Sequence, residues 1–234
     1  MRRARMASDP ALQAELAATL TDGARAVGCA LDADRQRMLL DYLMLLAKWN
    51  RVYNLTAVRE PHAMLIQHLL DSLAVIAPLR RRVGDMPTRL LDVGSGAGLP
   101  GLVIATMLPR VDVTCVDTVG KKVSFVREAA GALGLRNLQA VQGRVEALSA
   151  PLFDVITARA FSSLAELAAL TRALLRSGGV WMAMKGREPV DEIAAVPADI
   201  DVFHVEHLDV PCLDAERCLV WMRRRGDASN AGAG

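Results

Sequence analysis

The chain has 234 residues, of which 52% are hydrophobic and 23% are charged, and its net charge is +2. This length and apolar content suit one α/β domain with a helical extension and exclude a chain that is disordered throughout. No run of about 18 apolar residues appears, and the N-terminal segment is too charged for a signal peptide, so we expect a soluble, cytoplasmic protein without a membrane span.

Cysteine and arginine usage narrows the class of protein further. The cysteines form no C-x-x-C pair and have no histidines at zinc spacing, so we expect neither disulfides nor a metal site. The basic residues are 24 Arg and 4 Lys, and Arg gathers at 2–5, 80–82 and 223–225. Such clusters suit RNA phosphates and base planes. Codon bias is an equal alternative, because Ala is abundant as well.

The N-terminal third of the chain has a helical pattern. Apolar residues recur at helical spacing over 10–27, 33–52 and 60–77, which predicts three amphipathic helices. A break is expected at Pro78, because proline interrupts a helix that continues through it. We interpret residues 1–85 as an N-terminal helical cap and not as a separate enzyme.

From residue 86 to 225, short β-rich apolar runs alternate with helical stretches, which indicates βαβ units around a mainly parallel, seven-stranded sheet. The last two runs are joined by a short connection, which predicts an antiparallel hairpin. A sheet that ends in this way is typical of Rossmann-like class I methyltransferases. Residues 226–234 are expected to form a disordered tail. The predicted strands are 89–93, 111–116, 137–141, 153–157, 179–184, 200–209 and 216–224.

A glycine-rich segment, GSGAGLPG at 94–101, directly follows the first predicted strand. Such a turn lets the backbone approach a ligand and directs free amide groups at it. Its last three glycines fit the dinucleotide pattern G-x-G-x-x-G, while Gly94, Gly96 and Gly98 fit the G-x-G-x-G of methyltransferases. The loop alone does not distinguish the two cofactors, although Pro100 favours a late helix start and a wider loop.

Acidic residues follow the next strands. Asp117 ends the second strand, where a carboxylate can accept hydrogen bonds from both ribose hydroxyls of either cofactor. Its alternative role is to cap the helix over 119–133. Asp92, in the first strand, is expected to lie beneath the glycine loop. Val145 and Glu146 follow the third strand, where adenine is commonly bound by a backbone amide and a carboxylate; an exposed helix start is the alternative.

Longer strings cover nearly the whole chain, among them WNRVYNLTAVRE at 49–60, HLLDSLAV at 68–75, LLDVGSGAGLPGLVIA at 90–105, TARAFSSL at 157–164 and VPCLDAERCLV at 210–220. In these the chain resembles the bacterial 16S ribosomal RNA guanine-N7 methyltransferases of the RsmG/GidB family. The resemblance implies S-adenosylmethionine as cofactor and N7 of a specific guanine in 16S rRNA as methyl acceptor, within the small subunit or an assembly intermediate. It also implies cofactor contacts at Gly94, Leu99, Val145, Glu146 and Arg159, with Asp117 on the ribose.

Methylation of guanine N7 needs no general base, because this nitrogen carries a free lone pair. The chain lacks the N/D-P-P-Y/F loop used for exocyclic amines, and its fourth strand ends in Thr157-Ala158-Arg159-Ala160-Phe161. Catalysis is therefore expected to come from holding N7 and the methyl group in line. Arg159 is expected to position the cofactor carboxylate or the O6 of guanine. Its alternative role is a surface ion pair. The predicted cofactor contacts are Gly94, Ser95, Gly96, Gly98, Leu99, Asp117, Val145, Glu146 and Arg159.

Several further residues are candidates for RNA contacts. Phe161 could stack on the base or belong to the core. Lys121, Lys122, Lys185 and Arg187 flank the carboxyl ends of strands, where substrates bind in open α/β sheets. A solvated face is the ordinary role of any one of them.

Two further expectations concern the pocket wall and the class of protein. His68 and Asp71, three residues apart, could close the pocket from the cap or form an interhelix contact. The rival classes are an NAD(P)-linked oxidoreductase and a protein that binds RNA or a cofactor without catalysing a reaction. A monomer is the expected oligomeric state.

Overall fold

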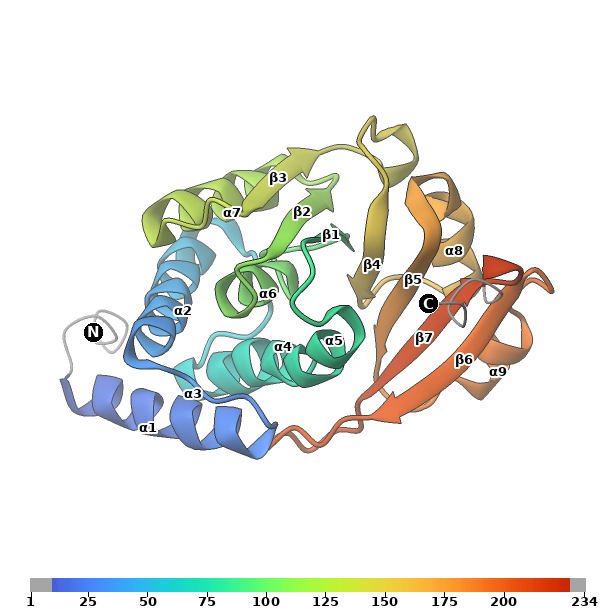
Figure 1. Cartoon of the computed structure of the whole chain (residues 1–234). Helices are drawn as coiled ribbons and strands as arrows, with labels where there is room; N and C mark the ends of the chain where they lie inside the picture. The colour runs from blue at the N-terminus through green and yellow to red at the C-terminus, as the bar shows by residue number, and fades with distance from the viewer. Residues whose placement is uncertain (1–9, 228–234) are drawn as a thin grey trace.

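A seven-stranded sheet organises the chain, and its strands lie in the order β3-β2-β1-β4-β5-β7-β6 (Figure 1). The computed structural model describes residues 10–227. Neighbouring strands from β3 to β5 are parallel, whereas β7 is antiparallel to both β5 and β6. The predicted sheet with its antiparallel hairpin is confirmed. The strands are β1 (Thr88–Val93), β2 (Val111–Asp117), β3 (Leu138–Gln142), β4 (Phe153–Arg159), β5 (Leu175–Lys185), β6 (Ile200–His207) and β7 (Cys218–Arg224).

The position of each strand in the sheet explains its sequence pattern. β1 and β4 lie in the middle and are buried along almost their whole length, so their sequences are nearly continuous apolar runs. The edge strand β6 is half-buried or exposed at most positions. From β1 the chain proceeds outward to β2 and β3, and then returns to β4 on the other side of β1. Ligands bind outside the carboxyl ends of the strands at such a reversal.

Helices cover both faces of the sheet (Figure 1). On one face, α6 (Gly101–Met107) and α7 (Gly120–Leu133) share a hydrophobic core with the N-terminal helices. On the other face, α8 (Leu164–Thr171) contributes to a second core that contains the fully buried Trp181. The shorter helices are η2 (Val145–Ala147), η3 (Arg172–Leu174) and α9 (Val190–Ala194).

The first two helices of the cap agree with the predicted ranges. They are α1 (Pro10–Ala26) and α2 (Ala33–Tyr53). Asp32 caps α2 because its side chain accepts a hydrogen bond from the amide of Arg35, at 2.7 Å. The helix ends where Asn54 adopts a left-handed conformation, with φ of 49°.

The third predicted helix is interrupted earlier than expected. It consists of α3 (Pro61–Met64), a π-helical segment η1 (Leu65–Leu70) and α4 (Asp71–Leu73), and α5 (Ile76–Val83) follows. The predicted break at Pro78 is wrong, since Pro78 is the third residue of α5. A proline is tolerated there because the amides of the first helical turn have no acceptor within the helix.

The stretch Pro61–Val83 is long and apolar enough to cross a membrane by length and composition. However, 72% of an apolar 18-residue stretch within this segment is buried inside the protein. The segment passes between the other cap helices and the sheet (Figure 1). Burial in the core is a sufficient explanation for its apolar sequence.

The chain ends differ in part from the prediction. Asp227 is fixed to the sheet, because its carboxylate accepts hydrogen bonds from the hydroxyl of Ser177 and the amide of Gly178, both at 3.0 Å. The tail is therefore ordered at this residue. Its remainder, residues 228–234, and the arginine cluster at 2–5 lie outside the described residues.

Candidate active site

A pocket of about 550 Å³ opens at the carboxyl ends of the central strands, where the chain order reverses. Its volume lies in the range of small-molecule sites. One wall comes from the cap, one from the glycine loop and one from the ends of β4 and β5 together with the residue before β7. The lining residues are Gln67, His68, Asp71, Gly94, Ser95, Gly96, Leu99, Lys122, Arg159, Ala160, Met184, Lys185, Gly186 and Arg217.

The glycine loop has the backbone conformation that its sequence predicts. Gly94, Gly96 and Gly98 have φ angles of 66°, 59° and 85°, which side chains rarely adopt. A Cβ atom at Gly96 would meet nothing within 4 Å, so the backbone there faces open space. Pro100 immediately precedes α6, as expected for a late helix start. A ligand can therefore approach this backbone closely.

Asp92 supports the loop from beneath, as predicted. Its Oδ2 accepts a hydrogen bond from the amide of Gly101 at 2.8 Å, which ties β1 to the start of α6. Burial raises the pKa of Asp92 to about 7, against the opposing effect of this hydrogen bond. Its Oδ1 has no hydrogen-bond partner among the described residues.

Asp117 lies beside the loop and is 7% exposed. Its Oδ2 accepts from the amide of Gly96 at 2.9 Å, and its Oδ1 accepts from the amide of Val119 at 2.8 Å. Lys122 lies 3.9 Å from Oδ2. Oδ1 therefore has the predicted role near the start of a helix, because Val119 directly precedes α7. A carboxylate has about four acceptor positions, so capacity for ribose hydroxyls remains.

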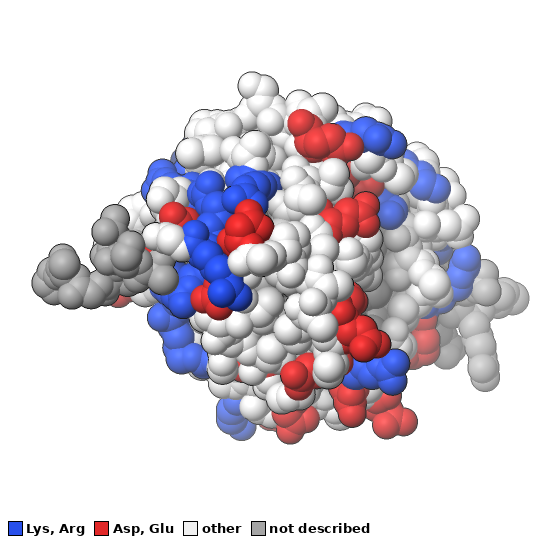
Figure 2. All heavy atoms as spheres, turned by 90° about the vertical axis from the view of Figure 1, so that its right-hand side faces the viewer, with Lys and Arg blue, Asp and Glu red and all other residues white. Residues whose placement is uncertain are grey.

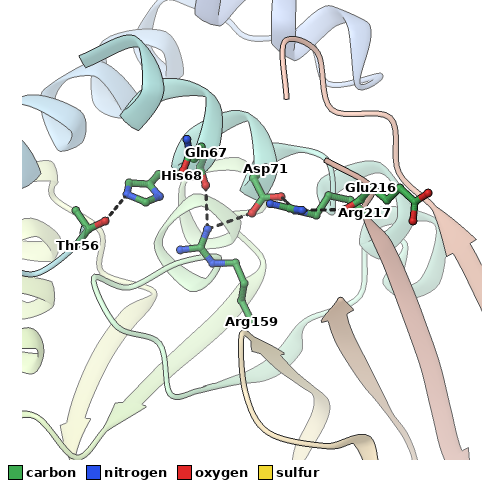
Figure 3. Close-up of polar contacts among 7 residues, drawn as sticks. All are labelled: Thr56, Gln67, His68, Asp71, Arg159, Glu216 and Arg217. Atoms are coloured by element: carbon green, nitrogen blue, oxygen red, sulfur yellow. Dashed lines mark hydrogen bonds and ion pairs between the residues drawn. The ribbon is translucent and has the colours of Figure 1, made fainter. Parts of the chain in front are cut away.

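Arg159, at the end of β4, reaches across to the cap (Figure 3). Its Nη1 donates to the carbonyl oxygen of Gln67 at 3.2 Å and to Oδ2 of Asp71 at 3.1 Å. The other oxygen of Asp71 accepts from Nε of Arg217 at 2.7 Å. Arg159 and Arg217 therefore meet at the carboxylate of Asp71, a residue that is 3% exposed.

His68 closes the same wall of the pocket. Its Nε2 lies 2.9 Å from the hydroxyl oxygen of Thr56 (Figure 3). Burial, and secondarily the charge of Arg159, lowers the pKa of His68 to about 4, so the imidazole is neutral at physiological pH. His68 and Asp71 line the pocket, as the first of the two predicted alternatives states. Their polar contacts lead to a loop residue and to arginines beside β4 and β7, and not to a neighbouring helix as the second alternative states.

The predicted RNA-contacting residues differ in their surroundings. Lys122 lines the pocket, while Lys121 and Arg187 are exposed beside it in the chain. Lys185 is 15% exposed, and its ammonium group donates to both carboxylate oxygens of Glu192 and to a backbone carbonyl. Phe161 is half-buried against the second core, with its ring beside Gly94.

The predicted adenine contacts lie outside the lining of the pocket. Val145 is buried in the second core, and the side chain of Glu146 is 42% exposed and lies 3.4 Å from Arg144. Both belong to η2, directly after β3.

In the arginine clusters at 80–82 and 223–225, which were predicted as possible RNA contacts, three of the six arginines pair with acids. Figure 2 shows Lys and Arg gathered on one part of the β6–β7 side, with Asp and Glu among them. Arg81 pairs with Glu206, and Arg223 pairs with Asp201 at 2.8 Å. This arrangement favours an ion-paired surface over a dedicated phosphate site.

Sequence reasoning missed Arg217, Gln67 and Met184, which also line the pocket. Arg217 lies in the connection between β6 and β7, 146 residues from Asp71, so no local spacing links the two. The string VPCLDAERCLV contains Arg217 and was the available signal.

Solved structures share the fold of this chain. TrmN from Thermus thermophilus superimposes with a TM-score of 0.52 at 22% identity, covering 64% of this chain and 48% of that one. A SAM-dependent methyltransferase from Aquifex aeolicus gives 0.52 at 16% identity, covering 68% and 92%. At such identities the likeness concerns the fold.

The chain belongs to the GidB family, rRNA small subunit methyltransferase G, whose family model matches residues 35–220. Ribosomal RNA small subunit methyltransferase G of Methylibium petroleiphilum is 59% identical, over 90% of this chain and 96% of that protein. The protein of the same name from Leptothrix cholodnii is 60% identical, over 91% and 97%. The resemblance found in the sequence is confirmed, and with it a methyltransferase that uses S-adenosylmethionine.

Proposed function

We propose that this protein transfers a methyl group from S-adenosylmethionine to N7 of a specific guanine in 16S ribosomal RNA. The carrying observation is a pocket in which the side chains that could take up a proton, Asp71 and His68, already have hydrogen-bond partners. Asp71 is held by two arginines, and His68 is neutral beside Thr56. Such a pocket suits a methyl acceptor that has no proton to lose, and guanine N7 is an atom of this kind.

The residues fit the cofactor. Bound S-adenosylmethionine supplies an electrophilic methyl group on a sulfonium. The open backbone of Gly96 leaves room for the amino-acid part, and the carboxylate of Asp117 has capacity for the ribose hydroxyls. Val145 and Glu146 would hold the adenine. The remaining predicted contacts, Ser95, Gly98 and Leu99, shape the loop between these groups.

Arg159 has the central positioning role in this proposal. Its guanidinium is fixed by Gln67 and Asp71, while the side chain remains 24% exposed in the pocket wall. It is placed to bind the cofactor carboxylate or the O6 of guanine, and it cannot serve as a base because arginine stays protonated. Rate acceleration would come from orientation of the two reacting atoms.

The family supports ribosomal RNA as the substrate. We propose that 16S rRNA is bound within the small subunit or an assembly intermediate, in the cytoplasm, by a monomer. Lys121, Lys122, Arg187 and Phe161 would contact the RNA. Lys185 would contribute its charge while it stays paired with Glu192. Residues 1–85 would act as a cap on the methyltransferase domain, residues 86–225.

The test is methyl transfer to small subunits from cells that lack this protein. With tritium-labelled S-adenosylmethionine we expect label in 16S rRNA, at N7 of one guanine when the nucleotide is mapped. Label on an exocyclic amine or a ring carbon would refute the N7 assignment. Calorimetry should also show binding of S-adenosylhomocysteine and none of NADH.

A further inference from the structure

The pocket has two halves that are built from different parts of the chain. The first half comes from the loop after β1 and from Lys122 at the start of α7. The second half comes from the end of β5, at residues 184–186, and from Arg217 before β7. Arg159 and Asp71 also line the pocket and form the boundary of the two halves, and Figure 3 shows Asp71 reached by both Arg159 and Arg217. The proposed cofactor contacts that line the pocket are Gly94, Ser95, Gly96 and Leu99 in the first half and Arg159 at this boundary, so the second half is available to the RNA.

The boundary carries excess positive charge. One carboxylate, Asp71, faces two guanidinium groups, and each of these takes one of its oxygens. The Asp71 side chain is 4% exposed, whereas the side chains of Arg159 and Arg217 are each 24% exposed. One positive charge is therefore left without an acidic partner in this group of three. An anion that enters the pocket would balance it.

Arg217 has unused hydrogen-bond donors in the second half. A guanidinium has five N–H groups. Within residues 10–227, Nε donates to Asp71, and Nη1 donates to the carbonyl oxygen of Glu216 at 2.8 Å. The other cation of this half, Lys185, is committed to Glu192 and to a backbone carbonyl. Arg217 is thus the better placed of the two to meet an incoming anion.

From this geometry, and resting on the proposed function, we propose that Arg217 binds a phosphate group of the ribosomal RNA next to the target guanine. A guanidinium matches phosphate oxygens with two parallel N–H groups. Asp71 is the positioning residue, because it holds Arg217 for the RNA and Arg159 for the cofactor on opposite oxygens of one carboxylate. The target nucleotide therefore enters over residues 184–186.

The test measures binding of small subunits that lack the methyl group, at a series of salt concentrations. Arg217→Gln should weaken binding roughly tenfold to a hundredfold. It should also reduce the slope of log affinity against log salt by about 0.7 to 0.9, the loss of one phosphate contact. The Kd for S-adenosylhomocysteine should stay within about twofold of wild type. Arg110→Gln is the matched control, since Arg110 is an exposed arginine just before β2, at the amino ends of the strands and so opposite to the pocket.

An unchanged salt slope for Arg217→Gln would overturn the phosphate contact, and so would a loss of S-adenosylhomocysteine binding as large as the loss of RNA binding. If this variant fails to fold, Arg217→Lys decides the question. It keeps the charge beside Asp71, so the salt slope should persist while the affinity for small subunits falls severalfold. A wild-type affinity of Arg217→Lys for small subunits would overturn the bidentate contact with phosphate. Methyl transfer by the wild-type protein tests the proposed function separately.

Discussion

The two halves of the pocket differ in how the sequence specifies them. In the first half the ligand-facing groups are backbone atoms of consecutive residues, 94–96, supported by Asp92 and Asp117 at strand ends. In the second half they are side chains that meet only in the folded chain, across 146 residues between Asp71 and Arg217. Local conformation determines the first half, and ion pairs between distant segments determine the second.

Removal of the shared carboxylate should have the largest effect. Asp71→Ala leaves two neighbouring guanidinium groups without their acid, which should lower the free energy of unfolding by about 3 kcal/mol. Chemical denaturation measures this. Asp41→Ala, at an exposed position of α2, is the control and should change stability little. A loss for Asp71→Ala no larger than for the control would show that the second half does not depend on this pairing.

The support beneath the first half should make stability depend on pH. The folded-state pKa of Asp92 is raised from 3.8 to about 7, so the folded protein retains this proton between those values while the unfolded chain releases it. Stability from this group is thus present at low pH and is lost as pH rises, by about 2 kcal/mol from pH 5 to 7.

Asp92→Asn should remove this part of the pH dependence, as thermal unfolding at pH 5, 6, 7 and 8 would measure. Asp112→Asn, at an exposed position of β2, should keep the wild-type dependence. The same pH dependence in Asp92→Asn as in wild type would contradict the assignment to this carboxyl.

Substitution of the boundary arginine should separate cofactor binding from RNA binding. Arg159→Gln removes a charged donor from the pocket wall and should weaken S-adenosylhomocysteine binding by about 1.5 to 3 kcal/mol. Isothermal calorimetry of this variant beside Arg217→Gln gives the comparison. Equal affinities of the two variants for this ligand would remove the distinction between the halves.

The smallest expected effect comes from the loop backbone. Gly94→Ala places a Cβ atom 3.3 Å from the ring of Phe161 at a φ of 66°, which should cost about 1 to 2 kcal/mol of stability. Gly131→Ala is the control, because Gly131 lies in α7 with nothing within 4 Å, and alanine there should stabilise the helix slightly. Thermal unfolding compares them, and equal shifts would show that the loop conformation imposes no strain.

The sequence by itself determined the sheet, the glycine loop and the placement of Asp92 and Asp117. These features depend on hydrophobic periodicity and on the conformational freedom of glycine, which act over a few residues. It misplaced the interruption of the third helix, because the position of Pro78 within a new first turn depends on how the preceding segment packs.

Only the tertiary structure decided the second half of the pocket. It brought Gln67, Asp71, Arg159 and Arg217 together (Figure 3). It also paired Lys185 with Glu192. The physical reason is that the energy of an ion pair depends on the distance between the charges in the folded chain. The spacing of those charges along the sequence does not predict which of them will pair.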